Sequence, residues 1–309
     1  PPEPLSICIS LSLSVSLDRK LMHSGSPNTL AIVILCRGRC GLFKCISRYL
    51  VAMTVADLMA VIIAVIFERI VYRNFPTSFV TITHICRLIG FLDSTTRDLS
   101  VWLTVTFTFD RYVAICCPKL KTKYCTEKTA LRVIAVVALI FFVENIPWSF
   151  GYIPQYIFND TPRDCQYKPS YHTSLLWIVF DWLQIILTPF LAFVLILLLN
   201  ALTVSHILIS SRARRRLRGH SDGDRNRGAS DSDPEMRKRK KSIILLFVVS
   251  ANFILLSMTF VLFFLYWRFS ETHYFTGYND PLYIICRSAF MLVYLSCCKI
   301  TCIYIQIAL

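Results

Sequence analysis

The sequence predicts an all-α bundle of seven transmembrane helices, because of its composition, its apolar runs and the placement of its basic residues. Of the 309 residues, 55% are hydrophobic and only 17% are charged, which is too few charges for the surface of a soluble domain of this length. Segment 243–267 carries no charge and is long enough to cross a hydrocarbon core of roughly 30 Å. We therefore expect a protein embedded in a lipid bilayer.

Seven apolar stretches are candidate spans. The first is short and contains His23, Pro27 and Asn28, so we expect a weak or truncated first helix. The last apolar run reaches Leu309, so the chain is expected to end at the seventh helix. Together the spans form one predicted membrane domain over 21–309. They lie near residues 21–36, 49–72, 86–114, 130–149, 173–204, 243–267 and 282–309.

Residues 1–20 differ from the rest of the chain. The stretch LSICISLSLSVSL alternates apolar residues with serine, and Asp18, Arg19 and Lys20 follow it. A signal peptide would have a basic region before its apolar part, and this stretch has none. Its alternation of apolar residues and serine also does not fit a membrane-spanning helix. Because a CT-dinucleotide repeat in DNA encodes alternating Leu and Ser, we expect residues 1–20 to be a non-native leader. Sequencing of the transcript would test this.

Most basic residues lie on one side of the predicted spans. The connections after the first, third and fifth spans hold twenty-two Lys and Arg residues, and the other connections hold five. By the positive-inside rule the richer side faces the cytosol. A plasma-membrane protein with its amino terminus outside and its carboxyl terminus inside is therefore expected. Topology also accounts for the net charge of +14, so we expect no nucleic-acid partner.

The connection 205–242 holds twelve of the 33 Lys and Arg residues, and we predict that it is a basic cytoplasmic loop. Its centre is rich in Gly, Ser, Asp and Asn, which predicts a disordered centre flanked by helical extensions of the neighbouring spans. Two interpretations remain open and are compatible. The charge either only sets the topology or also forms a docking surface for a cytosolic partner.

Motifs inside the spans indicate a family. Asp110-Arg111-Tyr112 closes the third span, and Cys86 lies 25 residues before Arg111. Asp57 stands in LVAMTVADLM of the second span, and Pro189 stands in the fifth. From about residue 24 to 305 the chain resembles the rhodopsin-like (class A) G-protein-coupled receptors. The stretch CGLFKCISRYLVAMTVADL and the acid-bearing third span look most like orphan receptors of the probable G-protein coupled receptor 139 type.

The resemblance implies a receptor without catalytic activity that binds a small extracellular ligand and activates a heterotrimeric G protein. An amine, an amino acid and a short peptide are the ligand classes that we consider. Arg111 is a charge at the cytosolic membrane edge, costly unless paired, and Asp110 is its adjacent partner. By resemblance, the residues of G-protein coupling and activation are Asp110, Arg111, Tyr112, Pro189, Phe253 and Tyr304.

The predicted outer loop between the fourth and fifth spans carries two further features. By resemblance, Cys165 forms a disulfide with Cys86 and so holds this loop across the mouth of the pocket. Asn159 begins a short glycosylation sequon, although Pro162 follows it. Most other cysteines lie in apolar runs or basic loops, where thiols act as small hydrophobes, and none has zinc-site spacing. We therefore predict no metal site of that kind.

Charged residues at the outer level of the spans predict a ligand pocket. Asp93 and Arg97 are four residues apart, in acid-then-base order, so an ion pair on one helix face is expected. Asp181 in the fifth span and Arg287 in the seventh should also point into the bundle, because charges facing lipid are costly. The alternative is a charge network that only fixes helix packing.

A buried carboxylate in the second span predicts a cation site. By resemblance, Asp57 and Ser100 would bind a structural sodium ion, since hard cations prefer oxygen ligands. No other cofactor is expected. The Asn-Pro-x-x-Tyr motif of the family, however, reads Ile300-Thr301-Cys302-Ile303-Tyr304 here, so only its tyrosine is present. This departure weakens the sodium prediction.

The sixth span also departs from the family. Ser257 and Thr259 stand where the family has Trp and Pro, and Arg239 stands where some members have an acid that pairs with Arg111. These changes keep a second interpretation open, namely a signalling-deficient or truncated receptor-like membrane protein that retains only the fold. A transporter is third, because we find no internal repeat. An enzyme is least expected, because no nucleophile–base arrangement or metal cluster occurs in the sequence.

Overall fold

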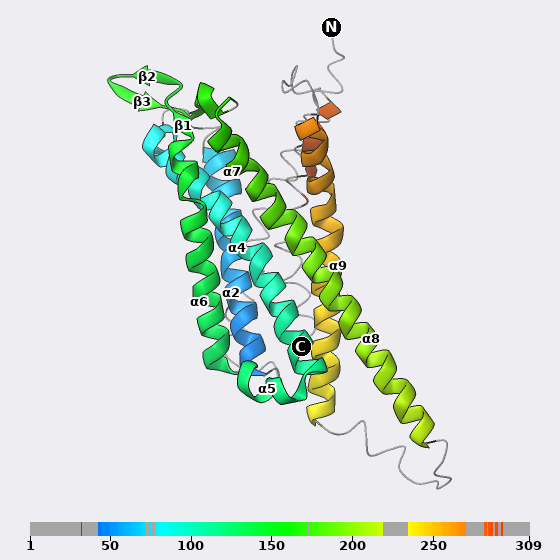
Figure 1. Cartoon of the computed structure of the whole chain (residues 1–309). Coiled ribbons are helices and arrows are strands. Elements are labelled where there is room, and N and C mark those ends of the chain that lie inside the picture. Colours follow the sequence, from blue (N-terminus) through cyan, green and yellow to red (C-terminus); the bar gives the residue numbers. More distant parts are fainter. Residues whose placement is uncertain are drawn as a thin grey trace, which may run out of the picture.

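The computed structural model describes residues 43–71, 78–171, 173–218 and 234–269, and positions 32, 75, 281, 282, 284–286, 288, 289 and 292. The leader 1–20, the predicted span near 21–36 except residue 32, and most of the span 282–309 lie outside these residues. Figure 1 shows long helices that run side by side, with short strands at one end. We call this the hairpin end, and we call the end that carries α5 the α5 end.

The first long helix covers the predicted span 49–72 and begins before it. α2 (Lys44–Val61) continues directly into a π-helical segment, η1 (Ile62–Val71). Lys44 and Arg48 lie in the helix because basic residues have helix propensities as good as those of most apolar ones. A boundary set by hydropathy alone was therefore too late at this end.

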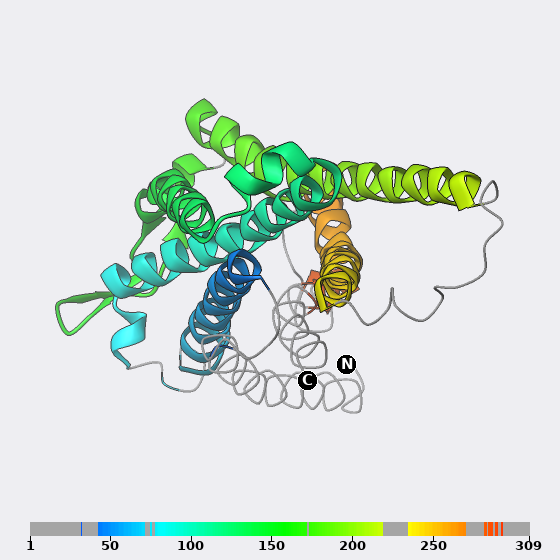
Figure 2. The same ribbon diagram turned by 90° about the horizontal axis from the view of Figure 1, so that it is seen from below.

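The helix α4 (Thr83–Cys116) is central in the described bundle and covers the predicted span 86–114. It contacts α2, α6, α8 and α9. Figure 2 shows α2 on one side of α4 and α6 and α8 on the other. A helix with neighbours on several sides can keep charged side chains away from lipid, which explains how α4 tolerates its Asp and Arg residues.

At the α5 end the chain turns through α5 (Pro118–Tyr124) into α6 (Glu127–Glu144). Thr126 caps α6, because its hydroxyl accepts a hydrogen bond of 3.2 Å from the backbone N–H of Thr129. The predicted span 130–149 covers most of α6 and most of the 3₁₀ turn that follows it, η3 (Ile146–Phe150).

The predicted span 173–204 is one helical run made of three segments. They are α7 (Leu175–Ile185), the π-helical η5 (Ile186–Leu191) and α8 (Ala192–Arg218). The π-helical segment contains Pro189, which lacks the backbone N–H that a regular helix requires. α8 extends beyond the apolar run into the basic connection, and α9 (Pro234–Phe269) begins before the predicted span 243–267. Both helices thus continue into the predicted loop 205–242.

Small antiparallel strands at the hairpin end were not predicted. β1 (Tyr152–Ile153) pairs with β4 (Gln166–Tyr167), and β2 (Tyr156–Phe158) pairs with β3 (Thr161–Arg163). The β2–β3 turn places Asn159 and Asp160 at φ of 48° and 55°, a conformation that Asn and Asp adopt more readily than most other residues. A short 3₁₀ turn, η4 (Pro169–Tyr171), then leads to α7.

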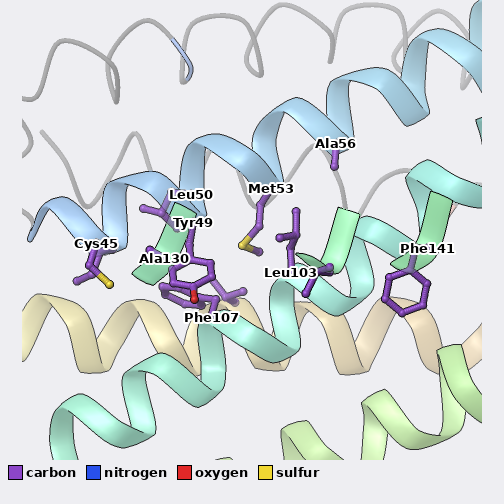
Figure 3. Packing of buried hydrophobic residues seen from close by; sticks show 12 residues of the cluster. Cys45, Tyr49, Leu50, Met53, Ala56, Leu103, Phe107, Ala130 and Phe141 are labelled. Carbon is purple, nitrogen blue, oxygen red and sulfur yellow. The ribbon is translucent and has the colours of Figure 1, made fainter. Parts of the chain in front are cut away.

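An apolar core joins α2, α4 and α6. Figure 3 shows Tyr49 and Met53 of α2 beside Phe107 and Leu103 of α4, and all four side chains are buried. The Tyr49 and Phe107 rings meet edge to face, with centroids 6.4 Å apart. The other labelled residues of this cluster are Cys45, Leu50, Ala56, Ala130 and Phe141.

Three helical stretches of the described residues are long and apolar enough to cross a membrane. They are Lys44–Phe67, Glu127–Phe150 and Leu175–Ser210. Several leucines of the third stretch are exposed among the described residues, Leu176 among them at 82%. A bilayer would cover such a surface, whereas a soluble monomer seldom has so large an apolar face. The prediction of an all-α membrane bundle is confirmed.

Candidate functional site

At the hairpin end, a disulfide joins Cys86 in the first turn of α4 to Cys165 between β3 and β4. The two Cα atoms are 6.3 Å apart, and this confirms the predicted pairing. Hydrogen bonds fix the same connection to the start of α4. The hydroxyl of Thr83 donates to the carbonyl of Asp164 at 2.9 Å, and the N–H of Asp164 donates to the carbonyl of Thr81 at 2.7 Å. The strand loop is therefore anchored to the central helix.

Asn159, the predicted glycosylation site, is exposed in the tight turn between β2 and β3. An exposed turn is the environment that a glycan requires. Its modification stays a prediction.

In the half of α4 toward the hairpin end, Asp93 and Arg97 form the ion pair that the sequence predicts. Arg97 Nη2 lies 2.9 Å from Asp93 Oδ2, and the two side chains are 23% and 12% exposed. The hydroxyl of Ser94 lies 3.4 Å from the same guanidinium nitrogen. The pair is thus mostly shielded from solvent, and its role in ligand binding stays a prediction.

Asp181 of α7 accepts a hydrogen bond of 2.7 Å from the hydroxyl of Tyr171 in η4. Tyr171 stacks on Tyr167 of β4 at 4.7 Å and lies 5.5 Å from the Trp177 ring. Asp181 is therefore tied to the strand loop through an aromatic cluster. Arg287 lies outside the described residues, so a pocket that includes Asp181 and Arg287 also stays a prediction.

A buried polar contact between α4 and α6 was missed by the sequence reasoning. Asn145, at the end of α6, donates through Nδ2 to Asp98 Oδ2 and to the carbonyl of Phe141, both at 2.9 Å. Asn145 is fully buried and Asp98 is 7% exposed. The sequence analysis assigned no individual role to Asp98. An Asn at the end of an apolar run was the available signal for its partner.

Asp57 of α2 is another buried carboxylate, and it accepts a hydrogen bond of 2.5 Å from the hydroxyl of Ser100 of α4. Asp57 is fully buried. A carboxylate and a hydroxyl are oxygen donors of the kind that hard cations prefer, so their chemistry fits the predicted sodium ion in part. The contribution of the seventh span lies outside the described residues, and sodium binding stays a prediction.

At the α5 end, Asp110 and Arg111 form the predicted pair. Arg111 Nε donates to Asp110 Oδ2 at 3.1 Å, and Arg111 Nη2 donates to the same oxygen. Both residues are buried, and the guanidinium carbon lies 5.9 Å from the centroid of the Phe107 ring. Tyr112 is partly buried, and its ring lies 6.5 Å from that of Phe109. The charge on Arg111 is thus compensated inside the protein.

For three other predicted activation residues, the structure describes only the backbone or nothing. Pro189 lies in η5 and Phe253 in α9, and their side chains are outside the described part of the structure. Tyr304 lies wholly outside it. Arg48 of α2 and Glu127 of α6 make an ion pair of 2.6 Å at the α5 end that the sequence analysis did not include.

The helical bundle, the anchored loop and the polar contacts of α4 agree with the seven-helix membrane receptor that the sequence motifs indicate. The chain belongs to the 7 transmembrane receptor (rhodopsin family), which it matches over residues 27–304. Members of this family are receptors and not enzymes. The finer resemblance to the 139 type stays a prediction.

Curated relatives match the chain over about half of its length. The dog and human cholecystokinin receptors type A are 27% identical over 163 residues, which is 50% of this chain and 37% of theirs. The pyrokinin-1 receptor of Drosophila melanogaster is 26% identical over 148 residues, which is 48% of this chain and 33% of its own. The matched part of the chain thus spans little more than a third of these relatives.

Proposed function

We propose that this protein is a G-protein-coupled receptor that takes a short peptide at its hairpin end and activates a heterotrimeric G protein at its α5 end. One observation carries the proposal above the others. The Arg111 charge is held inside the protein by Asp110 and becomes available to a partner only if α4 and its neighbours rearrange. Activation of a receptor requires such a two-state element.

The orientation follows from charge and from redox chemistry. Lys119, Lys121 and Lys123 lie in α5, which agrees with a cytosolic position for this end. The disulfide at the opposite end suits an oxidising compartment. We therefore propose that the amino terminus lies on the extracellular side and the carboxyl terminus on the cytosolic side of the plasma membrane.

A short peptide is the favoured ligand class, over an amine or a free amino acid. The names of the relatives, cholecystokinin receptor and pyrokinin-1 receptor, support this choice. The Asp93–Arg97 pair offers both charges within one turn of α4, so it suits a ligand that carries both a positive and a negative group. Asp181 and Arg287 would complete the charged lining. A structural sodium ion at Asp57 and Ser100 belongs to the same proposal.

A second candidate is a receptor-like protein that keeps the fold but does not signal. Its support is the replacement of the aromatic and the proline of the sixth span by Ser257 and Thr259. Thr259 lies within α9, which is helical from Pro234 to Phe269 without a break. Because proline is the usual cause of a sharp kink, its absence removes a familiar hinge.

The test is to express the full chain with an external tag and to measure surface level and nucleotide exchange on a panel of heterotrimeric G proteins. The ligands are a peptide library that includes cholecystokinin and pyrokinin, a set of amines and the free amino acids. Peptide-driven exchange that is lost in Asp93→Asn supports the first candidate. Surface expression without exchange for any ligand supports the second. Ion flux without a G protein would contradict both and favour a transporter.

A further inference from the structure

Asp110 accepts hydrogen bonds from three segments of the chain, and two of them reach its carboxylate. The Cys45 thiol of α2 donates to Asp110 Oδ1 at 3.2 Å, while Arg111 donates to Oδ2. The Cys125 thiol, between α5 and α6, donates to the backbone carbonyl of Asp110 at 3.6 Å. The Asp110 carboxylate is therefore held by Arg111 of its own helix, through two N–H groups, and by the Cys45 thiol of α2.

These contacts are shielded from solvent, so water cannot replace them. Asp110 is 1% exposed, Arg111 is 2% exposed and Cys45 is 3% exposed. A buried carboxylate that loses a hydrogen-bond donor cannot replace it with water. Removing any one donor therefore destabilises this arrangement. Burial and the charge of Asp110 raise the pKa of the Cys125 thiol to about 12, so it remains a protonated donor at neutral pH.

Cys45 also touches the other half of the pair. Its sulfur lies 3.9 Å from Arg111 Nη2, so the thiol spans from the carboxylate to the guanidinium. Cys45 also belongs to the apolar core cluster that contains Tyr49 and Phe107. An outward shift of the α5 end of α4 relative to α2 would break the contacts of Cys45 with Asp110 and Arg111 together.

We propose that Cys45 is a positioning residue that holds Asp110, and through it Arg111, in the closed arrangement and so lowers ligand-independent activity. This inference rests on the proposed G-protein coupling. Some family members have an acid that pairs with the residue matching Arg111, but this chain has Arg239 at that position. The proposal assigns the restraint on Arg111 to α2 instead. The competing explanation is that Cys45 only fills space, as buried cysteines often do.

The two explanations differ in what a substitution must preserve. Cys45→Val keeps an apolar side chain of similar size and removes the donor, whereas Cys45→Ser keeps a donor and is more polar. We expect basal nucleotide exchange per surface receptor to rise about fivefold in Cys45→Val and to stay near the parent level in Cys45→Ser. Asp110→Asn is the positive reference. Cys117→Ala, a thiol at the same end of α4, is the matched control and should change nothing.

A second readout does not depend on coupling. Amide hydrogen exchange of residues 111–117 is followed by mass spectrometry in the purified full chain in lipid nanodiscs. If Cys45 restrains this end of α4, exchange there is faster in Cys45→Val than in Cys45→Ser. Equal behaviour of these two variants in both assays overturns the proposal, whether both change or neither does.

If Asp110→Asn and every other variant fail to activate any G protein of the panel, the proposed function fails. The exchange assay then decides on Cys45 alone. Faster exchange only in the valine variant supports the positioning role, and unchanged exchange rejects it.

Discussion

Asn145 Nδ2 lies 2.9 Å from Asp98 Oδ2 and so joins the end of α6 to the middle of α4 inside the bundle. Asn145 is fully buried and also donates to the carbonyl of Phe141. Because both partners are removed from solvent, the contact links two helices at a point where water cannot compensate for its loss.

We expect Asn145→Ala to lower the free energy of unfolding by about 1–3 kcal/mol, because it leaves the buried Asp98 carboxyl without this donor. Thermal unfolding of the detergent-solubilised protein measures the effect. In the double variant with Asp98→Leu, the second change should cost much less than it does alone, since neither partner is then left unsatisfied. Additive losses would show that the two side chains do not interact.

Removal of the disulfide should destabilise the protein by about 4.5 kcal/mol at most, as expected from chain entropy for a closed loop of this size. The bond closes a sequence separation of 79 residues. Cys86→Ser, Cys165→Ser and the double variant should lose a similar amount of thermal stability and surface level. Cys116→Ser, at the other end of α4, is the control. An effect confined to one single variant would point to a role other than the shared bond.

The Asp57–Ser100 pair predicts a sodium effect. If these oxygens bind sodium, the solubilised protein should unfold at a higher temperature in sodium chloride than in choline chloride of equal ionic strength. The difference should shrink in Ser100→Ala and vanish in Asp57→Asn. Equal unfolding temperatures in both salts for the parent protein would remove the sodium site from the proposal.

The parts of the structure that the sequence predicts are those set by local pattern. Apolar runs place α2, α4 and α6, and the four-residue spacing of Asp93 and Arg97 predicts their ion pair. The neighbouring positions of Asp110 and Arg111 likewise predict their contact. Hydropathy was less informative at helix ends, because the basic residues of α2 and α8 continue a helix beyond the apolar run.

The contacts that were missed depend on how the helices are rotated and how far they are shifted along one another. Asn145 and Asp98 are 47 residues apart, and Cys45 and Asp110 are 65 apart. No periodicity within one helix shows which residue of another will face it. The strand pairs in the loop were missed because each strand has only two or three residues, too few for a visible alternation.

The last prediction concerns signalling strength: the chain as it stands should activate G proteins weakly even when it reaches the surface. Ser257 cannot act as a bulky aromatic switch, Thr259 gives α9 no proline kink, and Ile300 replaces the Asn of the family's seventh-span motif with an apolar residue. One feature argues for activation. Asp110 and Arg111 are paired and buried, so the chain keeps the arginine whose release the proposed activation requires.

The decisive comparison is between the parent chain and a variant that carries Ser257→Trp, Thr259→Pro, Ile300→Asn and Thr301→Pro. Basal and ligand-driven nucleotide exchange are measured at matched surface levels, so that a change in folding is not mistaken for a change in activation. We expect the restored variant to exceed the parent, because a bistable element gives a ligand two arrangements to distinguish. If the parent signals as strongly as the restored variant, its replaced motifs are not the parts on which its activation depends.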